Sequence, residues 1–266
     1  MLNLAHFLDV AAEEYPDITF CKLDNLAMTY PQIASAARRV ANLLTSKGVK
    51  PGDKVAMMIP NTPHFPIIYY GILHTGATVV PVNVLFQHHE IEHYLGDAEC
   101  VAFFAFKMFQ QDATKAFNNM ECCHNLFVVS TMDDMEDPPV GENFMKGMMS
   151  SSDVFDTHQT MPDDTAVLLY TSGTTGAPKG AELTHFNLFF NAYYSSREIT
   201  KVTPGDVALV TLPLFHSFGQ TCLMNSCMLS GGTMTLVPRF ETDQCMTVIA
   251  RDKVKTDIYS SGLYET

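Results

Sequence analysis

One ten-residue segment combines the residue types that are needed to hold a polyphosphate. Directly after the apolar run 166–170, residues 171–180 read TSGTTGAPKG. Glycine lets the backbone turn tightly, which brings N–H groups and hydroxyl donors close to a ligand. Lys179 adds the only full positive charge of the segment, and Pro178 stiffens the chain ahead of it. Such a segment is suited to wrap around a chain of phosphates.

The spacing within this segment differs from two well-known phosphate-binding patterns. The P-loop has the form G-x-x-x-x-G-K-[ST], whereas Lys179 stands three residues after Gly176 and is followed by Gly180. The dinucleotide pattern G-x-G-x-x-G is also not matched. From residue types alone, a surface turn rich in Ser, Thr and Gly remains the alternative. In that case Lys179 would be a solvated surface amine.

The composition limits the possible partners. The chain has 266 residues, of which 47% are hydrophobic and 17% charged, so we expect a globular protein with a large core. Its formal net charge is −13, with 16 Lys and Arg against 29 Asp and Glu. This argues against a nucleic-acid partner, which basic side chains in excess would have to bind. An anionic substrate must instead meet a local positive site.

Other features of the sequence have a plainer interpretation. The seven scattered cysteines predict reduced thiols, and no metal site is expected, since His88, His89 and His93 are interpreted as solvated surface residues. The acidic N-terminus does not resemble a signal peptide, and we expect a cytoplasmic protein. Residues 207–238 contain no charged side chain, but Pro213, His216 and several other polar residues favour core over a membrane span. Sixteen methionines suit either core filling or a pliable lipid tunnel.

The apolar pattern switches repeatedly between strand-like and helical periods, which predicts an α/β fold with largely parallel sheets. A hairpin turn is expected at Asp24-Asn25, and a capping box from Thr29 and Gln32 should begin the next helix. Helices are also predicted near 4–11, 61–76, 90–95, 144–149, 184–197, 221–229 and 242–251. Strands are predicted at 18–23, 26–29, 55–59, 79–82, 101–105, 127–129, 166–170, 207–212 and 233–237.

Several segments together make the sequence recognisable. Residues 169–180, continuing to Thr184-His185, closely resemble the phosphate-loop signature of the adenylate-forming superfamily of AMP-dependent synthetases and ligases. Met28-Thr29-Tyr30 and residues 75–83 (TGATVVPVN) resemble further motifs of that superfamily. Residues 212–219 (LPLFHSFG) resemble its segment that lines the acid-binding pocket. The resemblance is collinear to about residue 254 and looks most like fatty acid–CoA ligases of medium or long chain.

The resemblance implies a function and roles for residues. It implies activation of a fatty acid by ATP to an acyl-adenylate and then an acyl-CoA, with ATP, Mg²⁺ and coenzyme A as family substrates. Residues that would hold the phosphates are Thr171, Ser172, Gly173, Thr174, Thr175, Gly176 and Lys179. Phe215, His216 and Gly219 would lie at the acyl or ATP pocket. A lone His216 in an apolar stretch could equally be a hydrogen-bonded core residue.

The resemblance also sets expectations for the organisation of the chain. Residues 1–254 correspond to part of an N-terminal ATP- and acyl-binding domain, with subdomains expected at about 1–160 and 161–254. Residues 255–266 diverge from the pattern. The catalytic lysine and the Mg²⁺-binding glutamate of the superfamily are expected in a part that this sequence lacks, so no catalytic residue is assigned. We therefore expect a chain that is inactive alone and that could associate through surfaces exposed by truncation.

Two other functions remain open at this stage. One is a non-catalytic nucleotide-binding or interaction protein that has kept the phosphate loop. The other is an aryl-acid CoA ligase or a luciferase-like relative, because the early motifs of the superfamily discriminate poorly between substrates.

Overall fold

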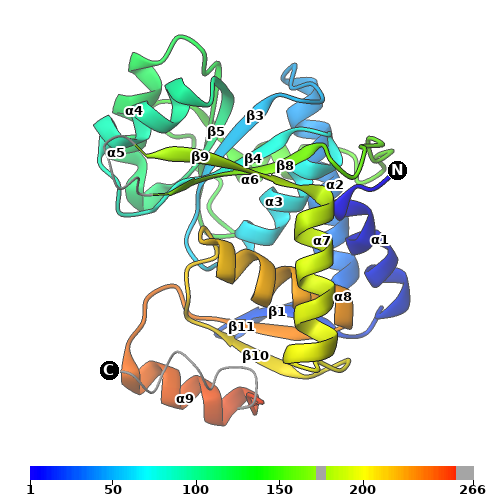
Figure 1. Cartoon of the computed structure of the whole chain (residues 1–266). Helices are drawn as coiled ribbons and strands as arrows, with labels where there is room; N and C mark the ends of the chain where they lie inside the picture. The colour runs from blue at the N-terminus through cyan, green and yellow to red at the C-terminus, as the bar shows by residue number, and fades with distance from the viewer. Residues whose placement is uncertain (172–177, 256–266) are drawn as a thin grey trace.

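The computed structural model describes residues 1–171 and 178–255, whose strands form two sheets with helices on both faces (Figure 1). The larger sheet has the strand order β7-β6-β5-β3-β4-β8-β9, in which every neighbouring pair is parallel except β8 and β9. Its strands are β3 (Lys54–Met58), β4 (Thr78–Pro81), β5 (Cys100–Phe106), β6 (Asn125–Val129), β7 (Glu142–Asn143), β8 (Thr165–Thr171) and β9 (Lys179–Thr184).

The smaller sheet has the order β10-β11-β1-β2. Its strands are β1 (Thr19–Leu23), β2 (Leu26–Thr29), β10 (Val207–Val210) and β11 (Thr233–Leu236). Strands β10, β11 and β1 run parallel, whereas β1 and β2 form the expected hairpin around Asp24, whose φ is 51°. Each sheet therefore combines strands from both sides of residue 160, and the division into subdomains there stays a prediction.

The described helices lie in layers on and between the two sheets. They are α1 (Leu4–Glu14), α2 (Tyr30–Ser46), α3 (His64–His74), α4 (His88–Asp97), α5 (Gln110–Asn119), α6 (Phe144–Ser150), α7 (His185–Tyr194), α8 (Ser226–Ser230) and α9 (Thr242–Asp252). Short 3₁₀ or π-helical turns are η1 (Lys107–Phe109), η2 (Ser195–Ile199) and η3 (Gly219–Asn225). This α/β architecture with mostly parallel strands confirms the predicted fold class.

Three cores hold the layers together. The largest lies between the sheets and joins α1, α2 and α3 to side chains of both, for example Val55 of β3 and Met234 of β11. Every residue of α3 is buried in this layer. A second core packs α4 and α5 against the outer face of the larger sheet, and a small third core packs α9 on β10. The burial of apolar side chains in these layers is the main source of stability.

Several local predictions are confirmed at the residue level. Thr29 and Gln32 form the capping box of α2, with Pro31 in the first turn, because the two side chains satisfy N–H groups that the helix start leaves free. After α2 the chain turns at Gly48, whose φ of +85° favours glycine. Within the uncharged stretch 207–238, the elements β10, η3, α8 and β11 are largely buried, as expected for core, whereas the turn between β10 and η3 exposes Leu212, His216 and Phe218. None of the described helices has the length and apolar character that crossing a membrane requires.

One strand was missed, and three predicted elements were wrong in part. Strand β9 was missed because no element was predicted between the loop and residue 184, whereas the predicted helix start at Thr184 agrees with its place as the cap of α7. The helix expected over 184–197 ends at Tyr194 and continues as the π-helical turn η2. The helix expected over 221–229 consists of η3 followed by α8. In addition, β10 ends at Val210, two residues before its predicted end.

Candidate functional site

The predicted phosphate loop connects two antiparallel strands. Strand β8 ends at Thr171, β9 begins at Lys179, and these two residues are Cα partners across the pair. Both residues are exposed. The sheet therefore fixes the two ends of the loop. Ser172, Gly173, Thr174, Thr175 and Gly176, which were expected to bind phosphate, lie outside the described residues.

A cavity of about 410 Å³ opens beside the end of β8. It brings together three of the predicted site residues, Thr171, Phe215 and His216, from segments that are far apart in the sequence. Its lining is Pro81, Asn83, Phe86, Tyr94, Leu169, Tyr170, Thr171, Pro178, Phe215, His216 and Ser217. The cavity lies beyond the carboxyl ends of the parallel strands β4 and β8, where open α/β sheets bind their ligands.

Two tyrosines form the aromatic side of this cavity. The rings of Tyr94 and Tyr170 lie 4.2 Å apart between centroids, and the Tyr170 hydroxyl donates a hydrogen bond of 2.5 Å to Asp97 Oδ2. Burial first, and then the carboxylate of Asp97, raise the pKa of Tyr170 well above its usual value. Tyr170 therefore stays a neutral phenol at physiological pH. Neither Tyr94 nor Asp97 was assigned from the sequence, because their contact with β8 is long-range.

The segment that carries His216 forms a tight turn after β10. The His216 N–H donates to the carbonyl of Pro213 at 3.1 Å, and the Gln220 N–H donates to the carbonyl of His216 at 3.0 Å. The imidazole of His216 is exposed and lines the cavity, so the alternative of a buried core histidine is wrong. Leu214 of the same turn is fully buried. The turn thus anchors one residue in the core and presents its neighbours to the cavity.

Gly219 does not line the cavity, although it was expected at the pocket. A Cβ added at this position would lie 2.3 Å from the carbonyl oxygen of Pro213. Only glycine allows η3 to approach the turn of His216 this closely. Gly219 therefore acts through packing, by holding the turn against the start of η3.

A second cavity of about 260 Å³ adjoins the first and shares Ser217 with it. It lies between α7 and η3 and is lined by Leu183, Asn187, Leu188, Asn191, Ser217, Phe218, Thr221 and Cys222. None of these lining residues was among the site residues predicted from the sequence. The spacing of Asn187 and Asn191, four residues apart on one helix, was the available signal.

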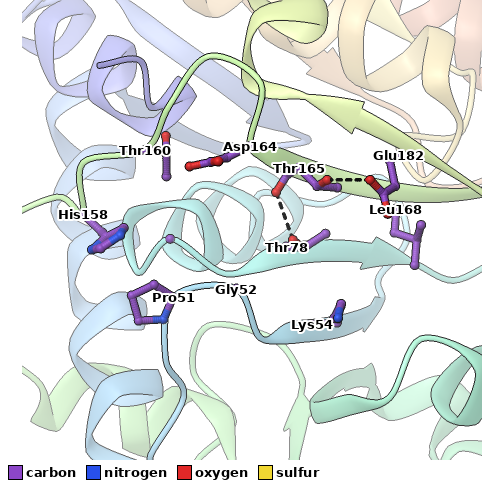
Figure 2. Close-up of a pocket in the computed structure, with 11 residues that line it drawn as sticks. Pro51, Gly52, Lys54, Thr78, His158, Thr160, Asp164, Thr165, Leu168 and Glu182 are labelled. Carbon is purple, nitrogen blue, oxygen red and sulfur yellow. Dashed lines mark hydrogen bonds between the residues drawn. The ribbon is translucent and has the colours of Figure 1, made fainter.

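A third cavity, of about 380 Å³, lies at the opposite ends of the strands and contains none of the predicted site residues (Figure 2). Three of its polar side chains, those of Thr78, Thr165 and Glu182, take part in hydrogen bonds that join strands. Thr78 Oγ1 donates to the carbonyl of Thr165 at 2.9 Å, and Thr165 Oγ1 donates to Glu182 Oε2 at 3.0 Å, as the dashed lines in Figure 2 show. These bonds tie β4, β8 and β9 together, so we interpret the cavity as a structural junction.

The described residues 1–171 and 178–255 contain no group of three His, Cys, Asp or Glu side chains placed to hold a metal ion. His88, His89 and His93, which have a metal-like spacing, lie at α4, where His88 Nδ1 is 3.4 Å from Asp112 Oδ1. Of the three, His89 is exposed, as expected for a solvated surface residue. His88 is partly buried, and so is His93, whose ring packs against Tyr170 and whose Nε2 is buried, so the interpretation as solvated surface residues does not hold for His93.

Comparison with known proteins places these features in a family. The sequence matches the family described as "AMP-binding enzyme" over residues 8–259. It is 30% identical to a long-chain-fatty-acid–CoA ligase of Bacillus subtilis, covering 94% of this chain and 49% of the relative. It is 31% identical to a feruloyl-CoA synthase of Amycolatopsis sp, covering 90% of this chain and 45% of the relative.

Solved structures show the same fold. The ATP-bound structure of MatB from Rhodopseudomonas palustris has a TM-score of 0.81 at 25% identity, and the match covers 94% of this chain and 48% of MatB. The N-terminal domain of FACL13 from Mycobacterium tuberculosis has a TM-score of 0.83 at 24% identity, with 96% of this chain and 62% of that chain covered. The chain thus spans about half the length of the curated relatives that it matches. It belongs to the AMP-binding enzyme family of adenylate-forming ligases and has the fold of their N-terminal domain.

Proposed function

We propose that this chain holds the phosphates of ATP at the connection between β8 and β9 and contributes to activation of a carboxylic acid as its acyl-adenylate. The observation that carries the proposal is the shared cavity of Thr171, Pro178 and His216. In this cavity the strand end at Thr171, where the proposed phosphate loop begins, lies beside the segment that resembles the acid-pocket motif. The family match and the ATP-bound relative support a nucleotide ligand.

The proposed reaction is a substitution at phosphorus. A carboxylate oxygen of the acid forms a bond to the α-phosphorus of ATP, and the bond to the bridging oxygen of pyrophosphate breaks. In the second step the thiol of coenzyme A forms a bond to the acyl carbon, and AMP leaves. This chemistry depends on alignment and on charge neutralisation rather than on a protein nucleophile. Lys179 and the backbone and hydroxyl donors of residues 171–176 would supply these effects.

Magnesium would enter this site together with the nucleotide, where it neutralises phosphate charge. Since the described residues offer no group of three metal-ligating side chains, we assign no residue of this chain to the ion. We propose only that residues of this chain position the phosphates and the acid.

We further propose that the acid is a fatty acid, on the basis of the similarity to the Bacillus subtilis ligase. Two adjoining cavities with apolar lining from Phe215, Phe218 and Leu188 are compatible with an alkyl chain. An aryl acid is the second candidate, because the relatives include a feruloyl-CoA synthase and because Phe86, Tyr94 and Tyr170 offer ring faces.

The test has two arms. In the first, titration calorimetry measures binding of Mg-ATP and of a series of fatty and aryl acids to the 266-residue chain. In the second, acid-dependent exchange of pyrophosphate into ATP is measured on the chain and on a version extended with the second half of a family member. We expect binding in the first arm and exchange with the extended version. Binding without exchange in either version would favour a non-catalytic nucleotide-binding protein, and the absence of both would refute the proposal.

A further inference from the structure

One buried amide side chain connects the two sheets at their carboxyl edges. Asn61 lies just beyond the end of β3 in the larger sheet and is only 4% exposed. Its Nδ2 lies 3.3 Å from the carbonyl oxygen of Val210, 3.0 Å from that of Leu212 and 3.3 Å from that of Val237. These carbonyls lie at the end of β10 or just beyond the ends of β10 and β11 of the smaller sheet, about 150 or more positions away in the sequence.

The surroundings of Asn61 determine which way its amide points. Its Oδ1 accepts the N–H of Leu214 at 2.9 Å, whereas its Nδ2 faces the three carbonyls, which share two hydrogens. The opposite orientation would place an oxygen against three carbonyl oxygens and an NH₂ against an N–H. The carbonyl of Val210 also accepts the N–H of Val237 at 3.0 Å. Among the described residues, the carbonyls of Leu212 and Val237 and the N–H of Leu214 have their hydrogen bonds to Asn61, so at this buried position they depend on one side chain in one orientation.

The segment fastened in this way is the one that carries Phe215 and His216. Asn61 binds it at Leu212 and again at Leu214, and the turn closes with the bond from the His216 N–H to Pro213. Two bonds two residues apart define both the position and the direction of a short chain segment. The aromatic side of the cavity comes from Tyr170 of β8 and from Tyr94 of α4, which packs on the larger sheet, and Asn61 follows β3 of the same sheet.

We propose that Asn61 is a positioning residue, which sets the place of Phe215 and His216 against the end of β8 and so determines the shape of the cavity where the acid meets the nucleotide. This proposal rests on the proposed function for the role of the cavity. The geometric part, that Asn61 fixes residues 212–216, is independent of any ligand.

Asn42 provides a matched control. Its Nδ2 also faces three carbonyl oxygens, those of Arg38 at 3.3 Å, Ser152 at 2.8 Å and Val154 at 2.9 Å. It fastens a surface segment, and none of these residues lines the cavities beside β8. The pairs Asn61→Ser with Asn42→Ser and Asn61→Asp with Asn42→Asp thus compare the same chemical change at two asparagines whose Nδ2 faces three carbonyl oxygens, one buried beside the cavity and one partly exposed away from it. Asn61→Asp keeps an acceptor for Leu214 but loses the donor to the three carbonyls.

The experiment has two readouts on the full 266-residue chain, at a temperature where every variant is folded. Amide hydrogen exchange of residues 212–216 should become at least tenfold faster in Asn61→Ser and stay within twofold in Asn42→Ser. The dissociation constants of dodecanoate and Mg-ATP, measured by calorimetry, should rise at least fivefold in both Asn61 variants and stay unchanged in both Asn42 variants.

Unchanged exchange in Asn61→Ser would overturn the proposal, as would unchanged affinities in both Asn61 variants when the wild-type chain binds. If Asn61 had only a structural role, the Asn61 and Asn42 variants would both lose stability, and the affinities for dodecanoate and Mg-ATP would not fall selectively in the Asn61 variants. If the wild-type chain binds neither ligand, the proposed function fails. The exchange comparison then decides alone whether Asn61 fixes the His216 segment.

Discussion

Thr171 and Lys179 are partners across the antiparallel pair β8 and β9, so the sheet holds both ends of the predicted phosphate loop at one place. The same strand end borders the cavity that contains His216. Thr171 and His216, from two separate parts of the chain, thus line one cavity, and Lys179 is the Cα partner of Thr171 across the strand pair.

Replacing Lys179 with alanine should weaken nucleotide binding selectively. Removing an ammonium group that neutralises phosphate should raise the dissociation constant of Mg-ATP by about tenfold or more, equivalent to about 1.4 kcal/mol. Because Lys179 is exposed, the free energy of unfolding should change by less than about 0.5 kcal/mol. Calorimetry with ATP and with dodecanoate measures the effect, and Lys115→Ala on the exposed face of α5 is the control. An equal loss of Mg-ATP affinity in Lys179→Ala and Lys115→Ala, or no loss in Lys179→Ala, would show that Lys179 does not neutralise the phosphates.

Replacing Gly219 with alanine should displace the turn of His216. The new Cβ would lie 2.3 Å from the carbonyl oxygen of Pro213, a backbone atom that moves only with its turn. We expect a loss of about 1–3 kcal/mol in the free energy of unfolding, measured by urea denaturation. Gly96→Ala in α4 is the control, since its Cβ would meet only Met120 Sδ at an ordinary 3.4 Å and alanine favours helix. Equal stability of the two variants would show that the close approach is absent in solution.

Three buried histidines should make the protein sensitive to mild acid. Burial lowers the pKa of His64, His74 and His185 to about 4 in each case. The folded state therefore binds fewer protons than the unfolded state between pH 4 and about 6.5. Stability should be fully retained above pH 6.5 and should fall as the pH drops through this window, by about 2–4 kcal/mol between pH 6 and pH 5.

Urea denaturation at several pH values checks this dependence. His185→Asn is a suitable variant, because an amide oxygen can accept the N–H of Leu4 as His185 Nδ1 does at 3.1 Å. The slope of stability against pH should decrease by roughly one proton in this variant. A wild-type protein whose stability is constant from pH 7 to pH 5 would contradict the burial of these side chains.

The outer face of α7 should promote association between molecules. Phe186, Phe190 and Tyr194 form a stacked ladder with centroid distances of 5.8 and 6.5 Å, and about half of each side chain is exposed. Exposed apolar patches of this kind favour self-association. Phe190→Glu should lower the average mass measured by sedimentation at high protein concentration. Met108→Glu, which changes an isolated exposed side chain, should not. The same average mass in wild type and Phe190→Glu would show that this face of α7 does not mediate association.

Sequence patterns predicted the local elements well where the deciding interaction is itself local. The capping box of Thr29 and Gln32 and the turn at Asp24 involve neighbouring residues, and both are confirmed. Strand β9 could not be predicted in this way. Its first four residues are all exposed, so it lacks an apolar alternation, and only its pairing with β8 makes it a strand.

The same contrast between local and long-range interactions holds for the residues of the site. Its sequence-adjacent parts, such as Phe215 and His216, could be identified from a motif, whereas Tyr94 and Asp97 reach Tyr170 only through the fold. Asn61 was interpreted as part of a helix start because it precedes Thr62 and Pro63. Its actual contacts lie in the other sheet, and no local pattern encodes them.

Mapping hydrogen exchange with and without Mg-ATP tests the central claim most directly. The account predicts that the nucleotide protects amides in the peptides that cover residues 165–184 and 212–219. Protection confined to residues 51–54 and 158–164, beside the cavity of Figure 2, would contradict the account, as would no protection at saturating nucleotide.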